Sequence, residues 1–511
     1  MPERREQEDI AALAKGGRTN VMGFVLRLVA RLPFLLVAGR LYGAATLGRF
    51  AYAILIIEFA AQLATIGLKR GLAEQLSHAE QQDGRPAAHV VADAILLTFI
   101  GSLIVAAPLM LFPQAMFPNS GIHGLDRLLP LAILGSAVAD VALAACAYRF
   151  NVAATVRARA VIEPWTISIA AFAFYFYSAR DGLILSYVVS IIAAFFAALW
   201  PAFRLYGLPS GWRPHPSRLW HMTRRNLPLA AADAIELGTR RLDVLILGLF
   251  TAPYVVGIYY VAQQFASLPQ KLKTSFEPVL GPVITRNIAE GNLTGIAGQV
   301  CQVGFWIVSA QLLIALVLGM PGEAVMGIVG PNFVGGTAAL VFLLAAEVLA
   351  APAVVSEAAL VYLARLRNLY ISIGMIALQA LLTVALILVA RRFGLPPMWI
   401  AAMPALALAL ALLAGALAKS VLLGRIVGVT IRVWRPILIL AGLATGLVGG
   451  AFAALPRRFE WTELVFGIPL MIAVYGIIMW RWGFGEEDRA LFSRSAKADA
   501  SSQLGVQGAP R

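Results

Sequence analysis

The chain consists of long, continuously apolar blocks separated by short polar connections. Most blocks span about 20 residues, which as a helix crosses the roughly 30 Å hydrocarbon layer of a membrane. Only helices and closed barrels satisfy their backbone inside lipid, and the blocks lack the alternation of barrel strands. The 511 residues are 60% apolar and 13% charged, against about 25% charged in soluble domains. The sequence therefore predicts an all-α polytopic membrane protein.

We count about fourteen transmembrane helices from these blocks. Their limits lie near 20–39, 50–68, 87–112, 128–148, 160–179, 183–203, 226–250, 254–284, 296–320, 335–364, 368–390, 397–418, 436–455 and 462–480.

The distribution of Lys and Arg predicts the topology. With the N-terminus in the cytoplasm, 27 of the 41 cations fall in cytoplasmic segments, 8 on the opposite side and 6 inside spans. This is the positive-inside bias of multi-pass membrane proteins, and one span more or fewer would weaken it. We therefore expect both termini in the cytoplasm.

The net charge of +14 follows from the same bias, so no nucleic-acid partner is expected. We expect no cleavable signal peptide at the mixed-charge N-terminus, so the first span is expected to direct insertion.

A shift of 209 residues overlays the region of the first span on that of the seventh. It pairs Arg31 with Arg240, Gly39 with Gly248 and Gly48 with Gly257. Transporters are often built from such repeats, with the substrate site between the halves. Since the shift crosses six spans, the halves would share one orientation. We expect two six-helix lobes around a central cavity, plus two C-terminal helices.

These features predict six segments. They are a cytoplasmic N-terminal segment, an N-lobe, a cytoplasmic linker, a C-lobe, spans 13 and 14, and a disordered cytoplasmic tail, at 1–19, 20–206, 207–225, 226–424, 425–483 and 484–511.

Cations inside the spans are the first candidate site residues, because charges at membrane depth are costly and usually face a cavity or a partner. Arg27 and Arg31 share one face of the first span. Arg31 lies near the midplane, whereas Arg27 is closer to the cytoplasm and could snorkel. Arg240 lies at matching depth in the seventh span. The substrate-binding candidates are Arg27, Arg31, Arg240, Arg241, Lys271 and Lys273, of which the two lysines could equally snorkel.

Acidic residues inside the spans form a second set. Each could bind a coupling cation or proton, or could pair with one of the arginines. These residues are Glu58, Asp140, Asp233, Glu236 and Glu347. Asp93 and Glu163 lie near span ends, where a structural role is favoured.

Sequence signatures of enzymes are not found. The chain lacks a phosphate-binding glycine loop, metal-spaced histidines and a nucleophile elbow. We expect no enzymatic activity, no cofactor and no metal. A cavity with several arginines favours an anionic amphiphile, because guanidinium groups match phosphate oxygens.

Four motifs in order carry a family resemblance. They are AGRLYGAATLGRFAY at 38–52, FEPVLGPVI at 276–284, GPNFVG at 330–335 and RFGLPPMWIAA at 392–402. Together they resemble the polysaccharide transporters and O-antigen flippases, over about residues 16–430. This family belongs to the superfamily that also holds multidrug antiporters and the lipid II flippase. Leu395-Pro-Pro-Met departs from the glycine usual at that turn.

The resemblance implies a two-lobed bundle with a central cationic cavity that works by alternating access. It also implies a polyprenyl-diphosphate-linked oligosaccharide as cargo for surface polysaccharide biosynthesis, such as O-antigen, lipopolysaccharide or exopolysaccharide. Arg27 and Arg31 match the placement of basic residues in such cavities. Most members have twelve spans, and fourteen occur in the lipid II flippase branch. Membrane lipids, a polysaccharide polymerase and assembly proteins are the implied partners.

Three other functions remain open. A cation-coupled multidrug antiporter would require acidic groups in the N-lobe cavity, where arginines dominate instead. A membrane glycan-assembly enzyme usually has a large acidic extracytoplasmic loop, and the loops on that side are short. The third is a scaffold in a glycan assembly complex that transports nothing itself.

Overall fold

The computed structural model describes residues 32–83, 85–274, 284–288, 290–456 and 460–489, which form helices and no strand. Ten helical stretches within these residues are long and apolar enough to cross a membrane. The chain is thus all-α and multi-pass. Helices lie over the described part of each expected span from 50–68 onward, but those at 160–179, 226–250 and 254–284 are not among the ten. The number fourteen therefore stays a prediction.

The N-lobe contains the first group of helices. They are η1 (Ala38–Tyr42), α2 (Gly43–Ala64), α3 (Leu68–His78), η2 (Ala79–Asp83), α4 (Ala87–Leu111), η3 (Pro113–Ala115), η4 (Gly124–Leu131), α5 (Ala132–Tyr148), α6 (Val152–Thr155), η5 (Val156–Ile162), α7 (Glu163–Tyr175) and α8 (Gly182–Tyr206).

The C-lobe and the C-terminal helices follow. They are α9 (Pro216–Phe250), α10 (Pro253–Thr274), α12 (Leu293–Gly319), α13 (Gly322–Val329), η6 (Pro331–Gly336), α14 (Thr337–Leu363), α15 (Arg365–Arg392), α16 (Pro397–Val427), α17 (Pro436–Ala453), α18 (Glu460–Thr462), η8 (Glu463–Gly467), α19 (Ile468–Ile478), η9 (Met479–Gly483) and α20 (Glu486–Arg489).

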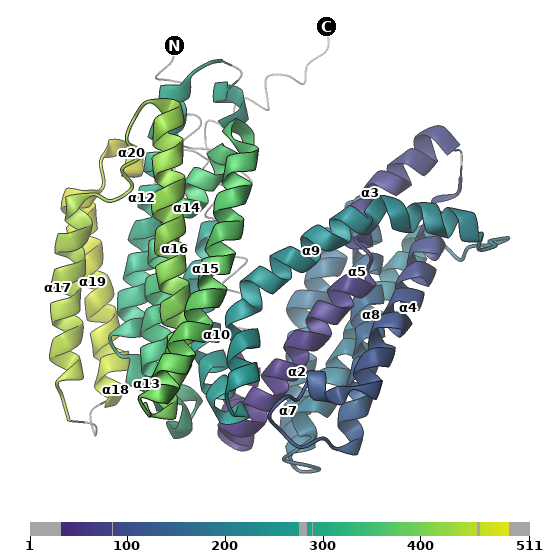
Figure 1. Cartoon of the computed structure of the whole chain (residues 1–511), viewed down its shortest axis with the longest axis horizontal. Helices are drawn as coiled ribbons and strands as arrows, with labels where there is room; N and C mark the ends of the chain where they lie inside the picture. The colour runs from purple at the N-terminus through teal and green to yellow at the C-terminus, as the bar shows by residue number, and fades with distance from the viewer. Residues whose placement is uncertain (1–31, 84, 275–283, 289, 457–459, 490–511) are drawn as a thin grey trace, which may run out of the picture.

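The two lobes meet at one end of the molecule and diverge toward the other (Figure 1). At the joined end, one continuous apolar core takes residues from both lobes, including Leu47 and Ile57 of α2, Tyr259 of α10 and Leu340 of α14. Toward the other end the cores are separate. Leu72 and Val90 belong to an N-lobe core, whereas residues of α12, α14 and α17 form a C-lobe core. We call these the closed end and the open end.

The tightest contact between the lobes is a crossing of α2 and α10 at two glycines. A Cβ on Gly48 would collide with the backbone of Pro253 and Gly257, and a Cβ on Gly257 would collide with the carbonyl of Ala44. Ala44 and Pro253 are 209 residues apart, like Gly48 and Gly257. The contact is therefore reciprocal under the shift found in the sequence, as expected if a two-fold axis relates the halves.

Two polar contacts also cross the closed end. The side-chain amide of Asn119 donates to the carbonyl oxygens of Gly248 and Thr251 at the end of α9, at 2.8 and 2.9 Å. The Nε of Arg40 donates to the carbonyl of Ile328 in α13 at 3.0 Å. Both bonds reach backbone carbonyls near helix ends, which lack partners within their own helices.

Helix α9 differs from the expected linker and seventh span. It is one helix of 35 residues that begins at Pro216, so the second half of the expected cytoplasmic linker 207–225 is helical and continuous with the expected seventh span. The assignment of 207–225 as a cytoplasmic linker stays a prediction. Proline is favoured in the first turn of a helix, where its missing N–H has no partner to lose. The helix lies over the N-lobe before it reaches the C-lobe (Figure 1), and it contacts helices of both.

The C-terminal helices α17 and α19 pack on α12, at the outer edge of the C-lobe (Figure 1). The tail was expected to be disordered from residue 484, but its first residues form α20. Asp488 is buried there and accepts hydrogen bonds from Trp306 at 2.7 Å and from Arg435 at 2.8 Å. Buried polar partners thus hold α20 against α12.

Candidate functional site

A cavity of about 260 Å³ lies between the lobes. Residues of α2, α7 and α8 line one side, and residues of α9 and α10 line the other. A second cavity of about 470 Å³ continues into the N-lobe. The two share Glu58, Glu163 and Tyr187 as lining residues. The two cavities therefore adjoin, and their walls, which contain both polar and apolar side chains, extend from the lobe interface into the N-lobe.

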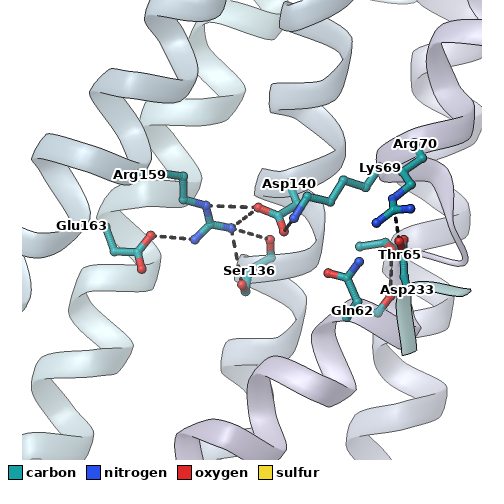
Figure 2. A network of polar contacts seen from close by, with 9 residues as sticks. All are labelled: Gln62, Thr65, Lys69, Arg70, Ser136, Asp140, Arg159, Glu163 and Asp233. Atoms are coloured by element: carbon teal, nitrogen blue, oxygen red, sulfur yellow. Dashed lines mark hydrogen bonds and ion pairs between the residues drawn. The ribbon is translucent and has the colours of Figure 1, made fainter. Parts of the chain in front are cut away.

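Arg159 is the centre of the N-lobe polar network (Figure 2). Its guanidinium donates to Asp140 at 3.1 Å through Nε and also through Nη2, to Glu163 at 2.7 Å, and to the Ser136 carbonyl at 3.1 Å. The three charged side chains are between 19% and 25% exposed. A mostly buried arginine with two carboxylate partners is oriented by its bonds, so it presents a fixed charge to the cavity.

The helix that carries Arg159 contains an unusually wide turn. Residues Val156–Ile162 form the π-helix η5, which runs directly into α7. Pro164 lies at the start of α7 and has no N–H to bond the preceding turn. Widened turns of this kind often accompany functional sites. Here the turn places Arg159 and Glu163 on the same cavity wall.

The start of α3 supplies two further cations. Lys69 reaches Asp140 at 3.2 Å and lines the N-lobe cavity, and Arg70 pairs with Asp233 of α9 at 2.7 Å (Figure 2). Asp233 is buried, whereas the two cations are about half exposed. Through Arg70 and Asp233, α3 is linked to the helix that bridges the lobes.

The C-lobe wall holds Arg241 through a chain of hydrogen bonds. Arg241 donates to the Gln263 oxygen at 2.7 Å, and the Gln263 nitrogen donates to Asp243 at 3.2 Å. Asp243 also accepts from Tyr259 at 2.5 Å, and both are buried. This chain joins α9 to α10 and keeps Arg241 at the interface cavity, where Gln263 also lines the wall.

Several sequence candidates lie outside the part of the chain that can be compared. Arg27 and Arg31 fall outside the described residues. The backbone of α9 and α10 includes Glu236, Arg240, Lys271 and Lys273, but the structure does not describe their side chains. Their proposed roles stay predictions. Of the six expected cations, Arg241 is described in full and lines the interface cavity, and its role in substrate binding stays a prediction.

The expected acidic residues fall into different environments. Glu58 is exposed in the cavity wall and lines both cavities. Asp140 is ion-paired with Arg159, and Asp233 is ion-paired with Arg70. Glu347 is buried in α14 and lines neither cavity.

Sequence reasoning missed Arg159, Glu163 and Lys69 as site residues. Arg159 was counted among the cytoplasmic cations, and Glu163 was assigned to a span end. Lys419, which is also counted among the cytoplasmic cations, is buried in α16 and pairs with Glu357 at 2.8 Å. The spacing of Arg159 and Glu163, four residues apart next to a proline, was the available signal.

The described walls carry both signs of charge. Arg241, Arg159 and Lys69 face Glu58, Glu163 and Asp140, and apolar side chains such as Phe34, Leu268 and Leu318 line the rest of the interface cavity. Within the described residues, no group of three or more His, Cys, Asp or Glu could hold a metal ion. The arrangement suits a guest with a charged part and a large apolar part.

Comparison with known proteins agrees with this architecture. Residues 37–291 match the family of polysaccharide biosynthesis proteins. No curated protein sequence matches the chain.

Solved structures show the same fold. The lipid II flippase MurJ, in an inward closed conformation, superposes with a TM-score of 0.64 at 12% identity, covering 90% of this chain and 98% of that one. A multidrug resistance MATE family transporter of the MOP superfamily in an inward-facing conformation gives 0.59 at 14% identity, over 82% and 94% of the two chains. An outward-facing structure with the same description gives 0.51 at 13% identity, over 82% and 96%. At these identities the likeness concerns the fold.

Proposed function

We propose that this chain, a polysaccharide biosynthesis protein by the match over residues 37–291, is a flippase for a lipid-linked oligosaccharide. The cargo is a polyprenyl-diphosphate-linked oligosaccharide, which the chain moves across the bacterial inner membrane for surface polysaccharide biosynthesis. Transport proceeds by alternating access, with both termini in the cytoplasm.

The observation that carries this proposal is the interface cavity with Arg241 in its wall. Arg241 is held by Gln263 and is surrounded by apolar side chains from both lobes. A guanidinium in a partly dehydrated site binds phosphate oxygens more strongly than it would in water. A diphosphate with a long lipid tail satisfies both the cation and the apolar wall.

Alternating access is supported by the difference between the two ends of the lobe interface. The lobes share one core at the closed end and have separate cores at the open end. The excess of Lys and Arg assigns the open end to the cytoplasm. The better superposition on the inward-facing than on the outward-facing transporter is consistent with that assignment. The structure is then an inward-facing state, ready to take up cargo from the cytoplasmic leaflet.

The proposal is tested with purified protein in liposomes that contain a fluorescent polyprenyl-diphosphate oligosaccharide. Wild type should move the lipid between leaflets. Arg241→Gln should reduce transport at subsaturating cargo by about tenfold to a hundredfold, since a hydrogen bond to a charged group contributes about 1.5–3 kcal/mol. The matched control is Arg367→Gln, because Arg367 is exposed in α15 and lines neither cavity. Failure of wild type to move the lipid, or equal loss in both variants, contradicts the proposal.

One observation favours a second function, a cation-coupled multidrug antiporter. Glu58 and Glu163 place two carboxylates in the interface cavity, as a cationic cargo would require. In this case wild type would export a cationic dye along a proton or sodium gradient. Glu58→Gln would abolish that export, and the oligosaccharide lipid would not move.

A further inference from the structure

A third cavity lies at the open end of the N-lobe, apart from the transport site. It has a volume of about 420 Å³ and lies where α3, α4 and the first turns of α9 pack together. Its floor is apolar and belongs to the N-lobe core that includes Leu76, Val90 and Met222. None of its lining residues lines the interface cavity or its N-lobe extension.

The polar walls of this cavity carry an excess of positive charge. Arg85, Arg218 and Arg225 line it, together with His78 and His221, and Asp93 is the one acidic residue among the described lining groups. The two oxygens of Asp93 are engaged by Arg85 at 2.6 Å and by the indole N–H of Trp212 at 2.8 Å. Asp93 therefore holds Arg85 in place, and its single negative charge does not balance the three arginines of the cavity.

The second arginine of the set has its own partner outside the cavity. Arg225 pairs with Glu74 at 2.6 Å, but the Glu74 side chain is 62% exposed and does not line the cavity. An ion pair this exposed is weak and exchanges readily with solvent. Arg218 forms no ion pair within the described part of the chain. The cavity thus holds two cations available to an incoming anion.

Two buried donors in the same walls have no partner in the described residues. They are the Nε of Arg85 and the side-chain amide nitrogen of Gln75. Buried donors without a bond are rare, and each one calls for an acceptor. An anion in this cavity would supply acceptor oxygens to both.

The start of α9 adds a further electrostatic contribution. Ser217 and Arg218 lie in its first turn, and the residue before the helix, His215, makes no capping bond with its side chain. The N-terminus of a long helix carries a partial positive charge and exposes backbone N–H groups, which favour phosphate.

We propose that this cavity, formed by α3, α4 and the first turn of α9, binds a phosphate group. Arg218 and Arg225 would contact its oxygens, with Arg85 and Gln75 donating from the wall. The phosphate could belong to an anionic lipid headgroup of the adjacent leaflet or to free phosphate, since both offer the same oxygens. Bound phosphate would fasten the first half of α9 to α3 and α4.

The test uses the full chain in detergent and does not depend on the transported cargo. Native mass spectrometry measures retention of dioleoyl phosphatidylglycerol against dioleoyl phosphatidylcholine, and calorimetric titration measures binding of inorganic phosphate. The variant is Arg218→Gln, whose side chain is exposed and makes no ion pair in the described structure. Arg224→Gln is the matched control, because Arg224 is an exposed cation of the same helix that does not line the cavity.

We expect at least one anionic probe to bind wild type and Arg224→Gln equally, and Arg218→Gln about tenfold more weakly. Preferential retention of phosphatidylglycerol assigns the site to a lipid headgroup, and binding of phosphate alone assigns it to the free ion. Either result supports the proposal. Binding of neither probe, or equal binding by Arg218→Gln and wild type, would overturn it.

Discussion

The closed end and the open end of the lobe interface use different kinds of contact. At the closed end a shared apolar core, a backbone crossing at Gly48 and Gly257, and bonds from Asn119 and Arg40 join the lobes. At the open end each lobe has its own core, and polar residues such as Asp140 and Arg159 bond within one lobe. In the proposed alternating-access cycle, opening the closed end would therefore be the costly step.

The largest effect should come from filling the crossing at the closed end. Gly48→Val would place a side chain against the backbone of α10, which cannot move aside as a flexible side chain would. Overpacking of this kind costs about 3 kcal/mol. We expect a clear fall in Tm of the purified chain and loss of transport.

The control for this variant is Gly374→Val. Gly374 lies in α15, and an added Cβ there meets no atom within 4 Å. If Gly48→Val has the same Tm as Gly374→Val, the crossing does not hold the closed end together.

The next effect concerns the N-lobe network. Arg159→Gln would leave Asp140 and Glu163 close together without their shared cation. Removing one partner of a buried ion pair costs up to about 3–5 kcal/mol, and the partial exposure here reduces this to about 2 kcal/mol. Thermal unfolding of the purified chain measures the loss. Adding Asp140→Asn should restore part of it, and a double variant no more stable than the single one would contradict the pairing.

A smaller effect is expected from Asn119→Ala at the closed end. The variant frees the carbonyls of Gly248 and Thr251, which water can reach once the lobes separate, so the expected cost is about 1 kcal/mol. The measurement is labelling of a cysteine at Ser120, beside this contact, by an impermeant maleimide, with Cys146 and Cys301 changed to Ser. Faster labelling indicates a looser closed end. Unchanged labelling would mean that the Asn119 bonds do not help to hold the closed end together.

The smallest effect should be that of Lys69→Gln at the open end. The Lys69 side chain is 47% exposed, and Asp140 keeps its bonds to Arg159 without it. Pairs of this exposure contribute about 0–1 kcal/mol. The Tm should therefore stay within a few degrees of wild type. A fall in Tm as large as that of Arg159→Gln would contradict the small contribution that we expect from the Lys69–Asp140 pair.

The fold was largely predictable because apolar length in a membrane leaves few alternatives to a helix. The start of α9 was missed, since residues 216–225 carry three arginines and show no apolar run. Hydropathy identifies the part of a helix that lies in lipid, whereas α9 continues over the N-lobe.

The site was less predictable than the fold. Arg241, one of the predicted cations, lies in the cavity wall, whereas Arg159 was assigned to a connection because it lies one residue before the expected span 160–179. Its position depends on the wide turn of η5 and on Asp140, which is 19 residues away in the chain. Hydropathy and spacing do not report such pairings.

The reciprocal crossing of Gly48 and Gly257 has a consequence for how such a chain could arise. In a dimer of identical halves, residues next to the two-fold axis contact their own copies. A single glycine position in the sequence would then supply both glycines of the contact. The fused chain needs two glycines, 209 residues apart, and both are present. If the halves descend from one ancestral gene, this contact is a remnant of its dimer interface. Each glycine would then be constrained by the other, even where the sequences around them have diverged.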